Sequence, residues 1–538
     1  MERPRGEGLN SDRRNLDRLG LAGLAVLGTL VVIAIMFLPA FPIDETRYLT
    51  VAWEMRQAGN WSLPTLNFEP YSHKPPLLFW LINASWSVFG LAVWPARLVG
   101  AAATGLVIFF THRLDRLLAP APAPGPAASA LMLLGLPLFL ALGLSIMFDM
   151  LLTATVSGAM LALWFAGRSG GWKAFVAYGV AVGLGLLAKG PVVLLFTVPA
   201  AVLARLWVDP QQRAGWPLRI AASLGIGVLL GLVWALRAAS IGGPEFAEML
   251  FWQQSAGRIA SSFAHARPFW FYVPVVLLFF LPLLVWRPAW LGLRMSFKIG
   301  GSARNFLLSW IVPALLGLSL ISGKQIHYLL PLLPAIALLV SLGLRRVAPT
   351  NADRFTWLAL GTALLMLLAA LAMDCGRFLP ADSGFASIAA QLDLPLVFLT
   401  GVLAIGAIAI SRGSTHRMLL GLAAANVIVL ASLTIQSRVI VAKSFDLQPL
   451  ADVVLTLRDR PIAVAQRTRG ELGFLARLER SLVYVPEEDL PSWLSQHPDG
   501  VAIVRERADR ANAMLTKGTL LYRQDYRLSE VIQVISAR

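Results

Sequence analysis

Residues 127–166 read AASALMLLGLPLFLALGLSIMFDMLLTATVSGAMLALWFA and contain a single charged side chain, that of Asp149. A helix needs about 20 apolar residues to cross the hydrocarbon core of a bilayer. The stretch therefore predicts two membrane spans, 127–146 and 150–166, with the lone acid in the short turn between them.

The composition of the whole chain agrees with a membrane protein. Of its 538 residues, 57% are hydrophobic and 14% are charged. In soluble domains about a quarter of all residues are charged. The net charge of +16 would suggest nucleic-acid binding in a soluble protein. Here the basic residues lie in short segments between apolar runs and no nucleic-acid-binding motif accompanies them, so we expect no nucleic-acid partner. The single cysteine, Cys375, excludes an intrachain disulfide and a cysteine-based metal site.

The apolar runs predict a mainly α-helical, polytopic protein with about thirteen spans. Residues 1–20 are basic and precede an apolar run, as in a secretory signal; because this run is long enough to span and further spans follow, we interpret it as a retained first helix. The predicted spans are 21–39, 93–112, 127–146, 150–166, 174–188, 190–207, 217–237, 269–286, 305–321, 327–344, 355–373, 394–411 and 416–436.

The basic residues predict which ends of the spans face inward. Arg and Lys fall in every second connection, for example in residues 287–304 and 345–354, where acids are few. Positively charged loops stay on the cytoplasmic side, so we expect the N-terminus inside and, after an odd number of spans, the C-terminus outside. The two long outer loops, 40–92 and 238–268, mix aromatic residues and prolines with charges, which suits amphipathic helices at the interface.

The composition changes near residue 441, where charges become frequent and apolar runs shorten. Alternating strand and helix patterns predict a small α/β domain in residues 441–538 on the outer side. The predicted organisation is thus a cytoplasmic basic N-terminus (1–20), a transmembrane domain (21–440) and this soluble domain.

Most of the chemically unusual residues fall on the predicted outer side. Charges near membrane depth are expensive and are functional-site candidates by default. These candidates and their neighbours are Asp44, Glu45, Arg47, Tyr48, His73, Lys74, Asp149, Lys189, Arg258, His265, Lys324, His327 and Tyr328.

Each candidate also has a structural interpretation. Asp149 has no polar loop around it, so a functional role is favoured. Asp44 and Glu45 sit at a predicted helix end, where a solvated cap explains them equally well from position alone. Lys74 and Lys189 could extend to the interface through their aliphatic stems, and a lone histidine is more often structural than a ligand.

Taken together, carboxylates and several cations at one membrane face indicate one reaction type. Cations can bind a lipid phosphate and stabilise it as a leaving group. A carboxylate can activate an acceptor or stabilise positive charge on a sugar. The sequence shows no glycine-rich nucleotide-binding loop, so the pattern predicts sugar transfer from a lipid phosphate.

Several segments resemble a known family, the aminoarabinose transferase and protein O-mannosyltransferase-related membrane glycosyltransferases of the GT-C fold. The order and spacing of the segments over the membrane domain carry the resemblance more than any one of them. They are Asp44-Glu45-Thr46-Arg47-Tyr48, Gly59-Asn60-Trp61, Lys74-Pro75-Pro76 with Trp80, Phe89-Gly90, Phe148-Asp149, Lys189-Gly190-Pro191, Pro268-Phe269-Trp270-Phe271-Tyr272 and Lys324-Gln325-Ile326-His327-Tyr328-Leu329-Leu330-Pro331.

The resemblance implies a polyprenyl-phosphate-linked sugar as donor, in this case undecaprenyl phosphate, and catalysis at the periplasmic face of a bacterial inner membrane. Carried over to this sequence, it makes Asp44 the catalytic carboxylate and Asp149 a second essential acid. The implied substrate-binding residues are Glu45, Arg47, Tyr48, Lys74, Lys189, Tyr328 and, in a loop that matches poorly, Arg258.

The chain departs from the family pattern before Lys74. Relatives have an acid at this position, and here it is His73. A divalent metal ion on His73 and His265 stays possible, but we predict no obligatory metal or other cofactor.

Three functional hypotheses remain open at this stage. The leading one is a glycosyltransferase with lipid A as acceptor, although relatives also modify other glycolipids, polysaccharides or proteins. A lipid or solute transporter is a second hypothesis, weakened because we find no internal repeat and because the charges cluster at one rim. An envelope assembly or binding protein without activity is the third, and the presence of both Asp44 and Asp149 counts against it.

Overall fold

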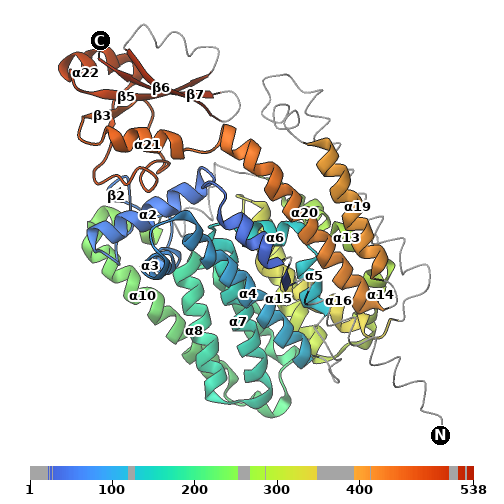
Figure 1. Cartoon of the computed structure of the whole chain (residues 1–538). Coiled ribbons are helices and arrows are strands. Elements are labelled where there is room, and N and C mark those ends of the chain that lie inside the picture. Colours follow the sequence, from blue (N-terminus) through green and yellow to red (C-terminus); the bar gives the residue numbers. More distant parts are fainter. Residues whose placement is uncertain are drawn as a thin grey trace.

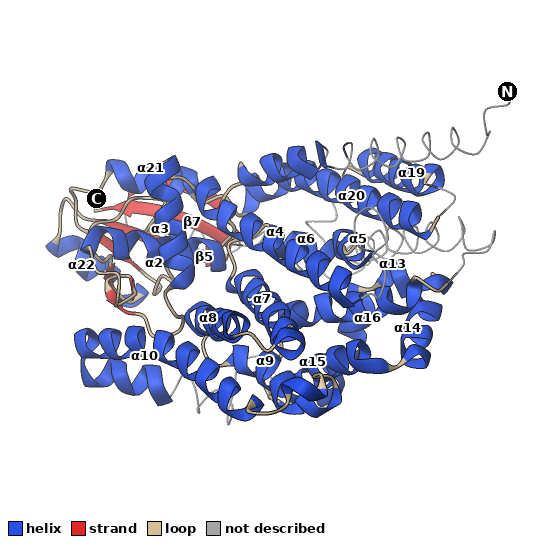
Figure 2. Ribbon diagram, turned by 90° about the horizontal axis from the view of Figure 1, so that it is seen from below, coloured by secondary structure: helices blue, strands red, loops and turns tan. Residues whose placement is uncertain are grey.

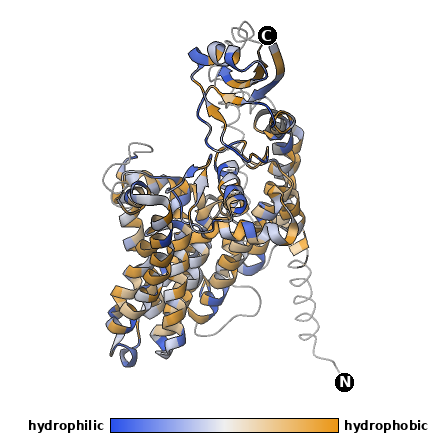
Figure 3. Ribbon diagram, turned by 90° about the vertical axis from the view of Figure 1, so that its left-hand side faces the viewer, coloured by the Kyte–Doolittle hydropathy of each residue, from blue (hydrophilic) through white to orange (hydrophobic). Residues whose placement is uncertain are grey.

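The computed structural model describes residues 22, 25–26, 28–118, 128–252, 267–284, 286–347, 393–411, 414–507, 519–526 and 530–537. Within these ranges the chain forms a bundle of long helices, with a smaller domain of strands and short helices at one end (Figure 1). All strands of the larger sheet lie at that end (Figure 2). Figure 3 shows hydrophobic colour along the bundle helices, whereas the small domain mixes hydrophobic and hydrophilic residues.

Seven helical segments in the described part of the chain are long and apolar enough to cross a bilayer. Together with the family fold reported below, they make this a multi-pass membrane protein. The helices that form these segments are α4 (Val93–Leu118), α7 (Phe148–Ser169), α8 (Trp172–Lys189), α10 (Trp216–Glu248), α15 (Gly301–Leu320), α16 (Leu333–Leu344), which follows the 3₁₀ helix η5 (Ile326–Leu332), and α20 (Thr415–Ser444).

Shorter helices fill the rest of the bundle, and two predicted spans prove discontinuous. The predicted span 127–146 divides into α5 (Ala128–Leu134) and α6 (Pro137–Gly143), with Leu136 extended at ψ 110°. Proline lacks an N–H and disfavours helical geometry in the residue before it, which explains the break. Residues 269–286 likewise divide into η4 (Phe269–Phe271), α12 (Tyr272–Phe279) and α13 (Leu281–Leu284).

Other predicted boundaries agree with the structure. The turn between 174–188 and 190–207 is confirmed, since α8 ends at Lys189 and is followed by α9 (Val192–Val202) and η1 (Leu203–Leu206). Helix α19 (Leu394–Ile410) matches the span 394–411. The span 355–373 lies outside the described residues, so the total of thirteen stays a prediction.

The first outer loop contains the predicted interfacial helices. Helix α2 (Asp44–Ala58) and helix α3 (Leu77–Phe89) flank a two-stranded ribbon, β1 (Thr65–Leu66) and β2 (Glu69–Pro70). In Figure 1 α2 lies across the end of the bundle beneath the small domain.

The second outer loop, predicted for residues 238–268, begins within helix α10 (Trp216–Glu248). Helix α10 has 33 residues, with a kink at Gly243 before Pro244. Gly243 has non-helical backbone angles (φ 80°, ψ 180°), so two helical segments meet at this kink.

The small C-terminal domain has the predicted α/β character. Its five-stranded sheet has the order β4-β3-β5-β7-β6, parallel from β4 to β5 and antiparallel from β5 to β6. Leu490, Leu494, Val504 and Ile535 are buried together in its core. The elements are α21 (Gln448–Thr456), β3 (Ile462–Val464), β4 (Val483–Tyr484), η7 (Glu487–Asp489), α22 (Leu490–Gln496), β5 (Val501–Arg507), β6 (Thr519–Tyr526) and β7 (Glu530–Ser536).

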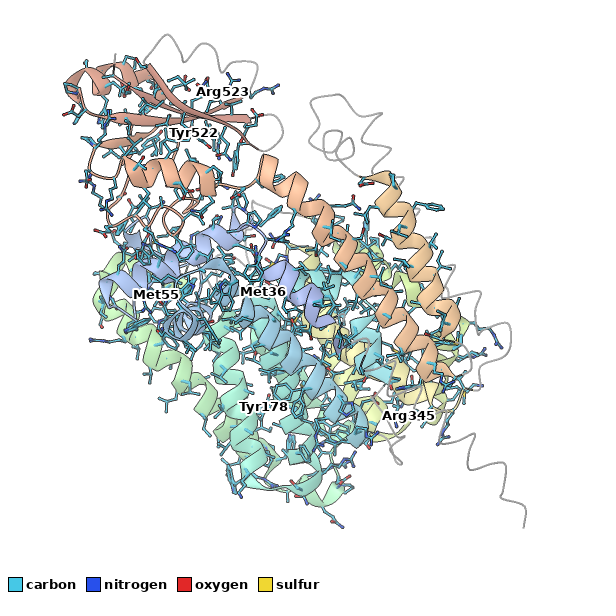
Figure 4. The ribbon with its side chains drawn as sticks, in the orientation of Figure 1. Met36, Met55, Tyr178, Arg345, Tyr522 and Arg523 are labelled. Atoms are coloured by element: carbon cyan, nitrogen blue, oxygen red, sulfur yellow. The ribbon has the colours of Figure 1, made fainter. Side chains whose placement is uncertain are left out.

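At the opposite end of the bundle, a buried carboxylate joins three segments. Asp115 of α4 is 2% exposed and lies 2.8 Å from an Nη atom of Arg345, and it also accepts hydrogen bonds from the hydroxyls of Ser129 and Ser341. Figure 4 shows Arg345 at this end, far from Tyr522 and Arg523 in the C-terminal domain. The Asp115–Arg345 pair therefore lies at the bundle end away from the small domain.

Helix α14 (Arg287–Ile299) packs against α16 through two glycines. A Cβ atom on Gly343 would lie 2.0 Å from the carbonyl oxygen of Gly292. We expect Gly343→Ala to separate the helices and lower the free energy of unfolding by about 1–3 kcal/mol, measured by thermal unfolding of the purified protein. Gly401→Ala in α19 is the matched control because nothing lies within 4 Å of that Cβ position; equal melting temperatures for the two variants would contradict the packing.

Candidate active site

The candidate site is built around the N-terminus of α7. Asp149 lies in the first turn of this helix and is 4% exposed. A carboxylate there is favoured by the helix dipole. The Lys189 ammonium group donates a hydrogen bond to Asp149 Oδ1, and His327 Nε2 lies 3.8 Å from the same oxygen. Asp149 was a candidate because it is the only charge in an apolar stretch. In the structure it contacts Lys189 and lies close to His327.

Three segments far apart in the sequence produce this cluster. Lys189 is the last residue of α8, and Gly190, at φ 77°, ends the helix there. His327 lies in η5, four residues before Pro331. Contacts of α7 with α8 and with η5 hold the three segments together, so the backbone fixes the ion pair.

Aromatic rings connect the cluster to the first outer loop. Lys189 Nζ lies 4.6 Å from the ring centroid of Tyr328. Lys74 Nζ lies 5.6 Å from the Phe148 ring, whose edge contact with Tyr48 has a centroid distance of 4.9 Å. Cations over aromatic faces are stabilised electrostatically. Tyr48, Lys74, Lys189 and Tyr328, four of the predicted substrate-binding residues, therefore surround Asp149.

Asp44 and Arg47 form the exposed part of the site. They lie one helical turn apart at the start of α2, 3.6 Å from each other, and the side chain of Asp44 is 57% exposed. Burial raises the pKa of the Tyr48 hydroxyl, and the charges of Asp44 and Asp149 raise it further. Tyr48 therefore stays protonated and lies within electrostatic range of both candidate acids.

Glu45 is buried and paired with an arginine. Its carboxylate lies 2.6 Å from Arg97 Nη2 in a buried ion pair, and it accepts hydrogen bonds from the backbone N–H groups of Phe41 and Ile146. Arg97 in turn donates to the carbonyl groups of Ile35 and Pro39. These contacts support a structural role for Glu45. The prediction that Glu45 binds substrate gains no support from them.

The remaining predicted residues divide into two groups. His73 is exposed, with its ring centroid 5.1 Å from that of Tyr71. Arg258 and His265 lie outside the described residues, and so does the proposed metal pairing of His73 with His265. Among the described residues no group of three or more His, Cys, Asp or Glu side chains could hold a metal ion.

Two residues of this region were missed or undervalued from the sequence. Arg97 was not singled out, although an arginine inside an apolar span is a signal of a buried partner. His327 was interpreted as structural, and the structure places it beside Asp149. Its partner was invisible because the two are far apart in the sequence.

The Glu45–Arg97 pair yields a stability prediction. We expect Arg97→Met to leave the Glu45 carboxylate buried without a cation, at a cost of about 3–5 kcal/mol in the free energy of unfolding, measured by thermal unfolding in detergent. The control is Arg56→Met in α2, whose guanidinium bonds only to the Ser87 hydroxyl at an exposed position. The double variant Glu45→Gln/Arg97→Met should recover part of the loss; a single variant as stable as the wild type would contradict the structural role.

Known proteins similar to this chain carry related names. Residues 73–236 match the family model described as dolichyl-phosphate-mannose-protein mannosyltransferase. An undecaprenyl phosphate-alpha-4-amino-4-deoxy-L-arabinose arabinosyl transferase from Pseudomonas fluorescens is 30% identical over 67% of this chain and 63% of its own length. The corresponding protein of Serratia proteamaculans is 32% identical over 55% of this chain and 54% of its own length. The match thus covers less than two-thirds of these relatives.

The fold extends the likeness to nearly the whole chain. The crystal structure of ArnT from Cupriavidus metallidurans in the apo state superposes with a TM-score of 0.77 at 19% identity, covering 97% of this chain and 98% of that one. The same protein bound to undecaprenyl phosphate gives a TM-score of 0.75. The chain is thus related, in sequence and in its GT-C fold, to the aminoarabinose transferase and protein O-mannosyltransferase group of membrane glycosyltransferases.

Proposed function

We propose that this protein is a membrane glycosyltransferase that moves a sugar from a polyprenyl-phosphate donor to an envelope acceptor. The observation that carries the proposal is the cluster of Asp149, Lys189 and His327, with Lys74 nearby, at the bundle end where α2 presents Asp44. Two carboxylates and several cations at the rim of a membrane domain suit the transfer of a sugar from a lipid phosphate.

Lys74 and Lys189 would hold the donor phosphate. Lys74 lies over the Phe148 ring and Lys189 over the Tyr328 ring, so both ammonium groups lie close to the Asp149 cluster. Phosphate–lysine contacts stabilise the negative charge that grows on the leaving phosphate as the bond to the sugar breaks. Asp149 would fix the position of Lys189, since the two side chains form a buried ion pair.

Asp44 would act on the acceptor. It is the exposed acid of the pair, so an incoming acceptor group can reach it. An acceptor oxygen attacks the anomeric carbon, its proton passes to the carboxylate, and the polyprenyl phosphate departs with the electron pair of the broken C–O bond. Arg47, one turn away, would orient the carboxylate through their ion pair.

The names of the relatives suggest the substrates. Those from Pseudomonas and Serratia are named for undecaprenyl phosphate-aminoarabinose, and ArnT has been crystallised with undecaprenyl phosphate. We propose aminoarabinose on undecaprenyl phosphate as donor and lipid A as acceptor. No cofactor is included in the proposal, because the two lysines supply the positive charge at the phosphate.

Carboxylate variants test this function directly. We expect Asp44→Asn and Asp149→Asn to reduce the rate of sugar transfer from undecaprenyl-phosphate aminoarabinose at least about 100-fold, since a positioned acid or base contributes that much. The assay measures donor consumption and product mass with purified protein in lipid. Glu69→Gln in β2 is the control, because this carboxylate is exposed in the same outer loop.

The outcomes separate the parts of the proposal. If both acid variants transfer sugar at the rate of the Glu69→Gln control, the assigned site is wrong. If the wild type consumes the donor and a different envelope molecule gains the mass of the sugar, lipid A is the wrong acceptor and the reaction class stands.

The cellular location is also part of the proposal: the bacterial inner membrane, with the candidate site facing the periplasm. In a Cys375→Ser background we expect Gln57→Cys in α2 to react with an impermeant maleimide added to intact spheroplasts, because α2 lies at the bundle end that we assign to the periplasm. Lys173→Cys, exposed at the start of α8, should react only after the membrane is opened. Labelling of both positions in intact spheroplasts would contradict this orientation.

A further inference from the structure

The C-terminal domain reaches down to the helix that carries Asp44 and Arg47. Between β3 and β4 its chain leaves the sheet, and residues 470–478 of this connection pack on α2 and α3. We call this segment the clasp. Figures 1 and 2 both show the C-terminal domain beside α2. We propose that the clasp positions α2 for sugar transfer, and that Thr50 is the positioning residue through which it acts; this inference rests on the function proposed above.

Thr50 is fully buried and uses its hydroxyl twice. Its Oγ1 donates a hydrogen bond to the Gly470 carbonyl oxygen at 2.8 Å and accepts one from the Phe474 N–H at 2.9 Å. A hydroxyl has one proton and can also accept, so both capacities are met by the clasp. No other type of side chain of this size offers the same pair of bonds except serine.

The backbone of the clasp approaches α2 closely on both sides of Thr50. A Cβ atom on Gly473 would lie 2.3 Å from Thr50 Cγ2, and one on Gly470 would lie 3.3 Å from Arg47 Cα. Gly470 also has φ +84°, a conformation that other residues rarely adopt. Contact at this range fixes the turn of α2 on which Arg47 and Tyr48 lie.

Aromatic packing attaches the clasp to α3 as well. Phe474 is 2% exposed and stacks on Trp86 of α3, with ring centroids 4.7 Å apart. The Arg477 guanidinium lies over the Phe474 ring, 3.9 Å from its centroid, and donates a hydrogen bond to the Leu91 carbonyl oxygen. Trp53 Nε1 donates to the Leu478 carbonyl oxygen at 3.0 Å.

These contacts give the C-terminal domain a role in catalysis at a distance. Asp44, Arg47 and Tyr48 lie on α2, and Lys74 directly precedes the Pro-Pro pair that leads into α3. A misplacement of about 1 Å in a reacting group can cost about 100-fold in rate. The clasp holds both helices against each other, so it sets the distance between the acid of α2 and the donor-binding lysine.

The test compares variants of full-length protein in lipid nanodiscs. Thr50→Val keeps the shape and removes both hydrogen bonds, Thr50→Ser keeps the hydroxyl, and Gly473→Ala places a methyl group against Thr50. Thr456→Val in α21 is the matched control, since its exposed hydroxyl bonds only within its own helix. Two quantities are measured: kcat and KM for the undecaprenyl-phosphate sugar, and hydrogen–deuterium exchange of peptides covering residues 44–55.

We expect Thr50→Val and Gly473→Ala to lower kcat about tenfold, with KM changed by less than about threefold, because the reacting group is displaced while the donor pocket is kept. Exchange of residues 44–55 should rise in the same two variants. Thr50→Ser should restore both quantities to within about twofold of the wild type, and Thr456→Val should leave them unchanged.

Other outcomes overturn the inference. Faster exchange with an unchanged kcat would show that the clasp only stabilises the fold, and unchanged exchange in both Thr50→Val and Gly473→Ala would show that it does not hold α2. If the wild type transfers no sugar, the proposed function fails, and the exchange of α2 alone then decides whether the clasp holds it.

Discussion

The ion pair between Glu45 and Arg97 determines where the two candidate acids lie. Glu45 follows Asp44 in the chain, and its carboxylate accepts a hydrogen bond from Ile146, three residues before Asp149. One buried side chain therefore links the start of α2 to the start of α7. Arg97 completes the arrangement by donating to carbonyl groups at the end of the first helix. A buried charge left without a partner is strongly destabilising, so this geometry has little freedom to change.

The same rule organises the charges at both ends of the bundle. At one end Asp115 is held by Arg345 and two serine hydroxyls; at the other, Asp149 is held by Lys189 with His327 nearby. The first cluster is closed, because its polar partners surround the carboxylate. The second has Lys74 nearby and lies at the bundle end where the exposed carboxylate of Asp44 pairs with Arg47. This difference distinguishes a structural charge cluster from a candidate site.

The C-terminal domain contacts the same helices that carry the first part of the candidate site. One set of its buried residues forms a separate core, whereas Val464, Ile503 and Val534 belong to the same hydrophobic cluster as the bundle. Its clasp packs over α2 and α3 with Phe474 and two close glycine contacts. Interfacial helices have one face toward lipid and lack the support that a bundle gives on all sides. A domain fastened to them from the aqueous side supplies that missing support, and the residues they carry gain a fixed position.

The sequence by itself determined the class of protein and the α/β character of its C-terminal region. It also predicted an orientation from its charges and most of the residues that the structure brings together around Asp149. These follow from local properties: apolar length, the placement of Arg and Lys, and lone charges such as Asp149. Only the tertiary structure showed that Pro137 interrupts a predicted span and that Glu45 forms an ion pair with Arg97. It also showed that His327 lies beside Asp149 and that the Thr50 hydroxyl bonds to the clasp. Each of these depends on contacts between segments tens or hundreds of residues apart, and periodicity and composition report nothing about such partners.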